Sequence, residues 1–169
     1  MRLFVSSPKY GDHYAIIDDD DYAKVKDFNW VLDLRRNSRK YARASYRVGV
    51  NKFKYHYLHR LVMNAPSGLQ VDHIDNDGLN NSKTNLRIAS HRQNLQNREK
   101  PISNTSRYKG VYLYKTGQFA GRYSVQVIVD NKRIWGGYFD TIKDAAIRYN
   151  ELAAKHHGQF AHLNSVPNE

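Results

Sequence analysis

The sequence contains no cysteine, which excludes disulfide bonds and every zinc site built on thiolates. No run of apolar residues is longer than four, so no segment is long enough to cross a membrane as a helix. Residues 1–10 also lack the apolar stretch of a signal peptide. These absences predict a cytoplasmic protein in a reducing compartment, without structural zinc.

Acidic residues are scarce relative to basic ones. Lys and Arg number 27 against 16 Asp and Glu, which gives a formal net charge of +11 in a chain of 169 residues. The charge predicts a polyanionic partner, with nucleic acid first, while a role in solubility alone is the alternative. The length allows one or two small domains with modest cores.

Residues 1–57 are expected to be rich in strands, with one short helix. The segment 14–17 is a plausible strand, and the acidic run 18–21 precedes a helical segment at 22–28. Four adjacent carboxylates suggest a metal site, but acidic residues are also favoured at helix N-termini, where they meet the positive end of the dipole. We therefore interpret the run as the start of the helix.

The segment 40–57 has the pattern of a β-hairpin with its turn near Gly49. Between residues 35 and 54 there are eight basic residues and no acidic one, with tyrosines interleaved. Such a surface can follow a phosphate backbone, and Arg43 and Arg47 are candidate DNA contacts. The alternative is a solvated sheet edge protected by charge.

The chemistry is concentrated in the next segment. Residues 71–74 and 85–88 are expected to form short strands on either side of a polar loop at 76–83. Ser90 followed three residues later by Gln93 is a capping-box pattern, so a helix should begin there. The predicted unit is strand, loop, strand, helix.

This unit can bring Asp72, His73 and Asn94 together. Carboxylate and amide oxygens are hard ligands suited to Mg²⁺ or Mn²⁺. A histidine beside them can take a proton from water near neutral pH. A metal ion would then polarise a scissile phosphate and stabilise the departing oxygen.

Asp72-His73, Asn85 and Asn94, in this order and spacing, resemble the HNH endonuclease family, in particular its phage and intron-encoded homing enzymes. The resemblance implies that His73 is the general base and that Asp72 and Asn94 are metal ligands. It also implies that Asn85 braces the loop and orients the histidine. A phage gene in a bacterial host would be a fitting source.

The last position of the motif is often histidine in the family and is Asn94 here. Because asparagine is a poor zinc ligand, this argues for Mg²⁺ or Mn²⁺. The segment 59–62 (His-Arg-Leu-Val) also resembles a feature upstream of the phage-type motif. We expect His59 to pack beside the site and support it.

The C-terminal segment predicts three strands, at 108–114, 122–129 and 132–139, and a helix that follows Thr141 and ends at Gly158. Alternation in the second strand should turn its valines toward the core. The helix carries one apolar stripe that can cover the sheet. Its expected members are Ala145, Ala146, Tyr149, Leu152, Ala153 and His156.

Tyr-Lys-Gly-Val at 108–111 and Gly-Tyr-Phe-Asp-Thr at 137–141 are among the residues by which segment 106–164 resembles the APETALA2-type DNA-binding domain. That family places the exposed face of its sheet in the major groove, which is wide enough for a β-ribbon. The positions that the resemblance puts near DNA are Lys109, Tyr112, Tyr114, Arg122, Ser124, Gln126, Lys132, Arg133 and Trp135.

Two departures from the APETALA2 pattern matter. Tyr112, Tyr114 and Gln126 stand where the plant proteins have arginines that read bases, so their sequence preference does not transfer. Gly136 replaces a larger apolar residue, which is expected to loosen the third strand.

The sequence thus predicts an α+β protein, with a ββα-metal HNH unit after a β-rich N-terminal region and before a three-stranded antiparallel sheet plus helix. The expected domains are 1–98, with the core motif at 59–98, a linker at 99–105, and 106–164. The predicted function is a homing-type, metal-dependent endonuclease that hydrolyses double-stranded DNA on one strand or both.

Several alternatives stay open at this point. The chain can be a non-catalytic DNA-binding or regulatory protein that keeps an HNH scaffold. It can also be a structure-specific or packaging phage nuclease with little sequence preference. The sequence does not decide between a monomer and a homodimer.

Overall fold

The computed structural model divides the chain into two compact units, which we describe separately. The structure describes residues 1–35, 38–99 and 106–167. Unit 1 covers residues 1–94 and unit 2 covers residues 95–169. Most of the linker predicted at 99–105 falls outside the described residues.

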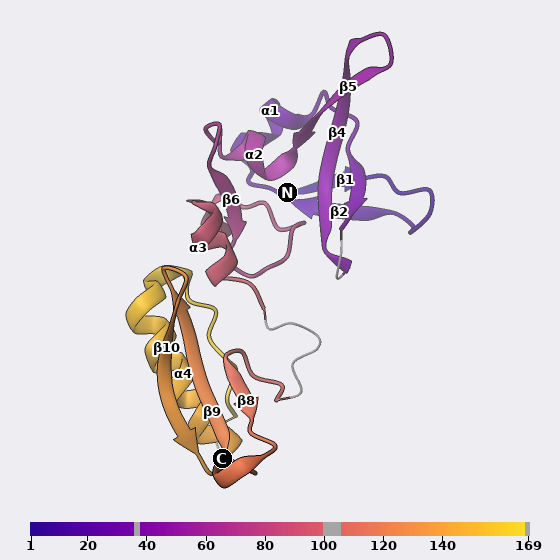
Figure 1. The fold of residues 1–169 in the computed structure, drawn as a ribbon. Helices are drawn as coiled ribbons and strands as arrows, with labels where there is room; N and C mark the ends of the chain where they lie inside the picture. The colour runs from indigo at the N-terminus through magenta and orange to yellow at the C-terminus, as the bar shows by residue number, and fades with distance from the viewer. Residues whose placement is uncertain (36–37, 100–105, 168–169) are drawn as a thin grey trace. The chain divides into compact units, whose positions relative to one another are not determined.

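Unit 1 begins with two antiparallel strands followed by a single helical stretch (Figure 1). These elements are β1 (Arg2–Val5), β2 (His13–Ile16), the 3₁₀ turn η1 (Asp19–Asp21) and α1 (Tyr22–Val25). The helix is shorter than the predicted 22–28. The acidic run also does more than begin it, because the carboxylate of Asp21 is buried and pairs with Lys24 and Lys83.

The predicted hairpin at 40–57 is confirmed and belongs to a three-stranded sheet of order β3-β4-β5. Its strands are β3 (Val31–Leu34), β4 (Lys40–Gly49) and β5 (Lys52–Tyr57). The turn contains Asn51 at a φ of 55°, in the left-handed region that asparagine tolerates better than most residues. The end of this hairpin projects from unit 1 (Figure 1).

The predicted strand, loop, strand and helix follow in order. The elements are α2 (Leu58–Val62), β6 (Gln70–His73), the 3₁₀ turn η3 (Lys83–Asn85), β7 (Leu86–Ala89) and α3 (His91–Gln96). Strand β7 begins one residue later than predicted, because Asn85 closes η3. The capping box is confirmed: the Ser90 amide donates to Gln93 Oε1 (2.8 Å), and the Gln93 amide donates to Ser90 Oγ (3.2 Å).

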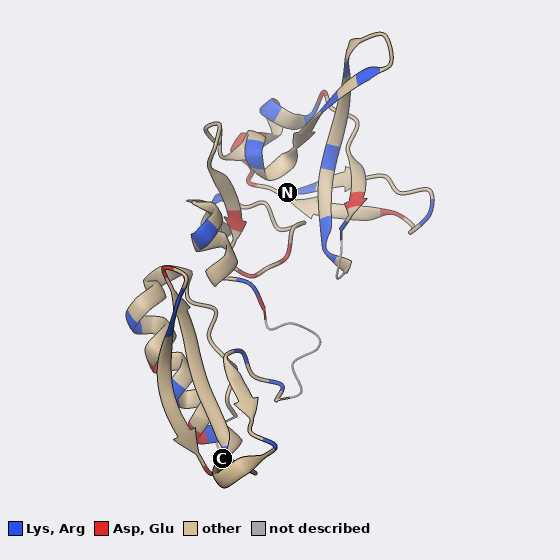
Figure 2. Ribbon diagram, viewed as in Figure 1, with Lys and Arg blue, Asp and Glu red and all other residues tan. Residues whose placement is uncertain are grey.

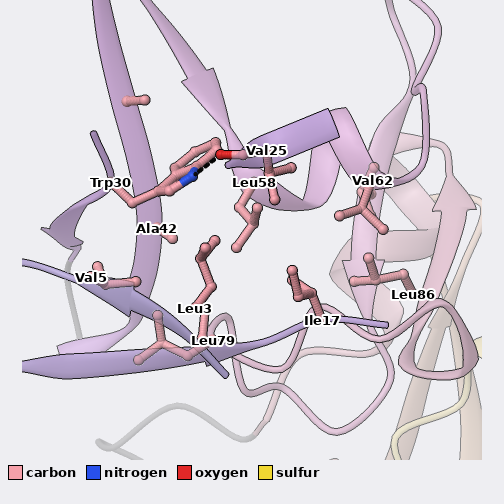
Figure 3. Packing of buried hydrophobic residues seen from close by; sticks show 13 residues of the cluster. Leu3, Val5, Ile17, Val25, Trp30, Ala42, Leu58, Val62, Leu79 and Leu86 are labelled. Carbon is pink, nitrogen blue, oxygen red and sulfur yellow. Dashed lines mark hydrogen bonds between the residues drawn. The ribbon is translucent and has the colours of Figure 1, made fainter. Parts of the chain in front are cut away.

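The core of unit 1 gathers side chains from nearly all of these elements (Figure 3). Leu3 and Val5 from β1 meet Val25 from α1 and Leu58 from α2. The indole of Trp30 donates to the Val25 carbonyl at 2.9 Å, which satisfies its N–H inside the core. The short strands of the motif are thus held by a core assembled largely from the N-terminal region.

Unit 2 is a three-stranded antiparallel sheet of order β10-β9-β8 with one helix packed on it (Figure 1). Its elements are β8 (Val111–Leu113), the 3₁₀ turn η4 (Gly117–Phe119), β9 (Tyr123–Val129), β10 (Lys132–Phe139), α4 (Ile142–His157) and the 3₁₀ turn η5 (Gly158–Phe160). Strand β8 is shorter than the predicted 108–114. Gly110 has a φ of +71°, which ends the extended run on its N-terminal side.

The apolar stripe of α4 is confirmed except at one position. His157 is buried and its Nε2 donates to the Ile128 carbonyl (2.9 Å), whereas His156 is exposed. His156 and His157 follow Ala153 by three and four residues, and both spacings place a residue on the same helical face as Ala153. Periodicity alone therefore did not show which of the two histidines is buried.

Gly136 does not loosen the sheet, which corrects the sequence expectation. Strand β10 runs to Phe139 with a bulge between Trp135 and Gly137. A Cβ on Gly136 would lie 2.7 Å from Val125 Cγ1 and 2.9 Å from Leu152 Cδ1. The glycine therefore permits close packing between strand and helix.

Within the described ranges, no helix has both the length and the apolar character needed to span a membrane.

Candidate active site

Asp72 and His73 end strand β6 and are both buried, with exposed fractions of 3% and 6%. Successive residues of a strand point to opposite faces, so the two side chains have different neighbours. Asp72 lies opposite Arg87 of β7, whose Nε and Nη2 donate to its Oδ2 at 2.8 and 2.6 Å. These two hydrogen bonds from one guanidinium hold the carboxylate in one orientation.

His73 packs against the rings of neighbouring histidine and tyrosine residues. Its ring centroid is 5.1 Å from that of His59, edge to face, and 5.9 Å from that of Tyr41. His59 in turn stacks on Tyr57 at 5.6 Å. His73 Nε2 also lies 3.3 Å from the Oδ1 of Asn81.

The two histidines are kept neutral by their surroundings. Burial lowers the pKa of His73 below its ordinary 6.5, although the hydrogen bond to Asn81 and the charge of Asp75 oppose the shift. Burial, followed by repulsion from His73 and Arg60, lowers the pKa of His59 to about 3. A neutral imidazole is the form that can take a proton at physiological pH.

Asn85 braces the loop between the two strands. Its Nδ2 donates to Asp75 Oδ1 at 2.8 Å and to the Asn80 carbonyl at 2.9 Å, and its Oδ1 accepts from the Asp75 amide at 3.1 Å. Its own carbonyl accepts from the Ile74 amide at 2.9 Å. The contacts of Asn85 thus hold Ile74 and Asp75, the two residues that directly follow His73.

Asn94 reaches strand β6 through one hydrogen bond. Its Nδ2 donates to Gln70 Oε1 at 2.6 Å, and Gln70 lies two residues before Asp72 and hence on the same face of the strand. The amide oxygen of Asn94 takes no part in this hydrogen bond. The capping box at Ser90 fixes the start of α3, which carries Asn94 on its first turn.

The donor set suits a hard divalent cation. Asp72 offers a carboxylate and Asn94 an amide oxygen, and the remaining positions of an Mg²⁺ shell are commonly water and substrate phosphate. Among the described residues, no cluster of three or more His, Cys, Asp or Glu side chains has the arrangement of a metal site.

Three contacts in and around the site were missed in the sequence. Asn81 is one of many polar residues in its loop, and Arg87 has no distinguishing pattern. Asp21 was read only as a helix-start residue, yet Lys83 Nζ lies 2.9 Å from its Oδ2. No pattern in one sequence identifies these contacts, since each joins residues brought together only by the fold.

The sheet of unit 2 presents several of the predicted DNA contacts to solvent. Tyr112, Tyr114 and Trp135 are exposed, with Trp135 at 54%. Lys132 and Arg133 are exposed at the start of β10, and Gln126 is half-buried. Trp135, Tyr114 and Phe119 all contact the ring of Tyr138.

Three other predicted contacts are engaged inside unit 2. Ser124 is only 8% exposed and lies within 3.3 Å of the Tyr112 carbonyl, so it is not presented to a ligand. Arg122 pairs with Asp140 at 2.7 Å. Lys109 Nζ donates to the Arg98 carbonyl at 2.6 Å, and burial lowers the pKa of Lys109 to about 8.

The β4–β5 hairpin carries Lys and Arg along its length (Figure 2). The guanidinium of Arg43 lies 4.3 Å from the centre of the Tyr55 ring and 3.8 Å from Asp33 Oδ1. Arg47 is exposed, and its Nε donates to the Gly49 carbonyl at 3.1 Å. Of the two, Arg47 is the more accessible to a phosphate.

Residues 56–96 match the family model described as HNH endonuclease. An uncharacterised HNH endonuclease of Acanthamoeba polyphaga mimivirus is 29% identical over 156 residues, which make up 90% of this chain and 75% of that protein. Protein 3.8 of Escherichia phage T7 is 46% identical over 46 residues, 27% of this chain and 38% of that protein.

The dehydration-responsive element-binding protein 2D of Arabidopsis thaliana is 29% identical over 87 residues, 52% of this chain and 41% of that protein. The chain thus spans less than half of the phage and plant proteins. The family match and the mimivirus protein support an HNH nuclease. HNH nucleases act on DNA and generally use a divalent metal ion.

Proposed function

We propose that the chain is a metal-dependent DNA endonuclease of the homing type, in which unit 1 cuts and unit 2 holds the DNA. One observation carries the proposal. Asp72 and His73 lie buried at the end of a strand whose following loop is braced by Asn85, inside the segment that matches the HNH model.

In this proposal His73 is the general base, and its neutral imidazole accepts a proton from the attacking water. Asp72 and Asn94 are the residues that would hold Mg²⁺ or Mn²⁺ through their oxygens. Such an ion, when bound, supplies charge that stabilises the departing 3′ oxygen. Arg87 holds the carboxylate of Asp72 in one orientation through two hydrogen bonds.

DNA binding is assigned to two surfaces. On unit 2 it is the exposed sheet face that bears Tyr112, Trp135 and Arg133; on unit 1 it is the basic hairpin with Arg43 and Arg47. The partial similarity to a plant protein named for binding a DNA element supports an APETALA2-like role for unit 2. Exposed aromatic and basic side chains suit contacts to bases and phosphates.

The proposal is tested by incubating supercoiled plasmid with the full chain, with Mg²⁺ and with a chelator. Relaxed or linear DNA that forms only with Mg²⁺ is the expected result. One site per chain favours relaxed circles, whereas a prompt linear product would indicate paired sites. Product that forms equally in chelator would contradict metal dependence.

A cleavage map on long DNA separates the remaining alternatives. Cuts at few positions support a homing enzyme, and dispersed or junction-specific cuts support a packaging or structure-specific nuclease. If a pool of random DNA sites is bound but never cut, the non-catalytic DNA-binding protein becomes the better account.

A further inference from the structure

The side chain of Asn81 is fully buried, with an exposed fraction of 0%, although it belongs to a polar loop. Its Oδ1 lies 3.3 Å from His73 Nε2, and its Nδ2 lies 3.5 Å from the Gly78 carbonyl. A carbonyl oxygen can only accept, so the amide nitrogen belongs on the side of Gly78. The amide oxygen therefore faces the imidazole and requires a proton on Nε2.

The backbone at Asn81 is held by the N-terminal region as well as by Asn85 of the motif, which donates to the Asn80 carbonyl. The Asn81 amide donates to the Ile16 carbonyl at 2.7 Å, and the Ile16 amide donates to the Leu79 carbonyl at 2.8 Å. Two residues further on, the Lys83 amide donates to Asp18 Oδ2 at 2.8 Å. Strand β2 and the turn after it thus hold the second half of this loop.

The His73 ring is also confined on its other sides. His59 approaches it edge to face, and Tyr41 lies 5.9 Å away between their centroids. Turning the imidazole over would place a carbon atom against the Asn81 oxygen and lose a buried hydrogen bond. The surroundings therefore favour one ring orientation and one tautomer.

We propose that Asn81 is a positioning residue of the nuclease: its amide oxygen accepts the Nε2 proton of His73 and so keeps the basic lone pair on Nδ1. This inference rests on the proposed function. In the reaction a water O–H bond breaks, the proton goes to Nδ1, and the hydroxide oxygen bonds to phosphorus. The P–O3′ bond breaks at the same time, and the 3′ oxygen leaves with its electron pair and takes a proton from solvent. Asn81 gains and loses no proton, because an amide is neither acid nor base at this pH.

The tautomer matters because only the nitrogen without hydrogen can act as base. In serine proteases, disturbing the tautomer of the catalytic histidine lowers kcat by about 10⁴. General-base catalysis as a whole contributes about 10² to 10⁴. Loss of the Asn81 oxygen should therefore reduce the cleavage rate by at least about 10² without weakening DNA binding.

The test uses the full chain with Asn81→Leu, which removes the acceptor, and Asn81→Asp, which keeps one. Leu79→Ala is the matched control, since it removes a buried side chain of the same loop and leaves the Asn81 amide in place. The first readout is the pair of ¹⁵N shifts of the His73 ring in metal-free protein, assigned by comparison with His73→Ala. The second is the single-turnover rate on plasmid beside the Kd for DNA.

We expect wild type and Asn81→Asp to carry the proton on Nε2, and Asn81→Leu to show a mixture of tautomers. The rate should fall at least about 100-fold in Asn81→Leu at unchanged Kd, and stay within about tenfold of wild type in Asn81→Asp. Leu79→Ala should keep the wild-type tautomer. A wild-type proton on Nδ1, or an Asn81→Leu variant with unchanged tautomer and rate, would overturn the proposal.

Two further outcomes are distinguishable. If Asn81→Leu does not fold, the wild-type shifts and the Asn81→Asp rate decide: Nε2 protonation with a retained rate supports the proposal, and Nδ1 protonation overturns it. If neither the wild type nor any variant cuts DNA, the proposed nuclease function is wrong and the positioning role in catalysis is wrong with it. The ¹⁵N shifts of His73 still report whether Asn81 fixes its tautomer.

Discussion

The rings of His59 and His73 lie edge to face, His73 disfavours a proton on His59, and burial lowers the pKa of both. The Nδ1 atom of His59 is buried without a hydrogen-bond partner. Such an atom is costly if it must carry charge. His59 is therefore a neutral ring that packs beside the proposed general base.

The depressed pKa of His59 predicts an acid-sensitive unit 1. Its folded pKa of about 3 lies below the unfolded value of 6.5. Between these values the unfolded state binds the extra proton, so stability falls as pH falls through this window. One such group lowers the free energy of unfolding by about 2 kcal/mol between pH 7 and pH 5.

His59→Phe should abolish that contribution while keeping a ring in place. The measurement is urea unfolding at pH 7 and pH 5, followed by the emission of buried Trp30 in a Trp135→Phe background. We expect the loss of stability on acidification to be smaller by about 2 kcal/mol in the variant. An equal loss in both proteins would show that His59 titrates normally.

At the residue scale, the sequence identified candidate residues by motif spacing, by charge pattern and by family resemblance. Asp72, His73, Asn85 and Asn94 were chosen by order and distance along the chain, and their roles remain proposals. Asn81 contacts His73 across eight residues of irregular loop. No periodicity governs such a loop, so its inward-pointing side chain cannot be read from sequence.

At the scale of elements, the loop after β6 packs closely against β4 because Gly78 has no side chain. A Cβ on Gly78 would lie 2.2 Å from the Lys40 carbonyl oxygen and 2.7 Å from the Tyr41 ring. The backbone oxygen cannot give way without moving strand β4. The glycine thus brings this loop against the tyrosine that borders His73.

Gly78→Ala should therefore shift the loop, with a loss of about 1–3 kcal/mol of stability, as overpacked sites show. Cleavage should fall as well, because Tyr41 and the loop carrying Asn81 would both move. Gly49→Ala is the control, since its Cβ would meet only the Lys52 side chain at 3.8 Å. Equal stability and activity of both variants would show that the loop packs loosely in solution.

Elements with a regular pattern were predicted well. The hairpin strands, β9, β10 and both capping residues, Ser90 and Thr141, follow alternation or cap chemistry. The sequence predictions differ from the structure where a contact formed only in the folded chain sets the environment of a residue. The acidic run became an anchor for Lys83, and Ser124 was buried by its place in the central strand.

At the scale of the whole molecule, each unit has its own hydrophobic core. The expected α+β class is confirmed as small antiparallel sheets with few helices. The arrangement of β6, β7 and α3 around a metal ion is a proposal. The division of labour between cutting and binding is likewise proposed, and it predicts separable effects of substitutions in the two units.

The charge of the chain predicts DNA binding that weakens steeply with salt. Each phosphate neutralised contributes about 0.9 to the slope of log K against log salt concentration. Lys132→Gln on the sheet of unit 2 should lower the slope by about that amount. Lys155→Gln, an equal charge change on α4, should lower it much less. Equal slopes for the two variants would show that this sheet is not the binding face.

The central claim is that Asp72, His73 and Asn94 form the cutting site of a protein whose DNA binding lies elsewhere. Its most direct test compares the full-length wild type, His73→Ala and the exposed-histidine control His156→Ala. Each is assayed for cleavage of supercoiled plasmid with Mg²⁺ and for DNA binding in chelator. The account predicts that His73→Ala binds like wild type and does not cut, while His156→Ala does both. Cleavage by His73→Ala at the wild-type rate would contradict it.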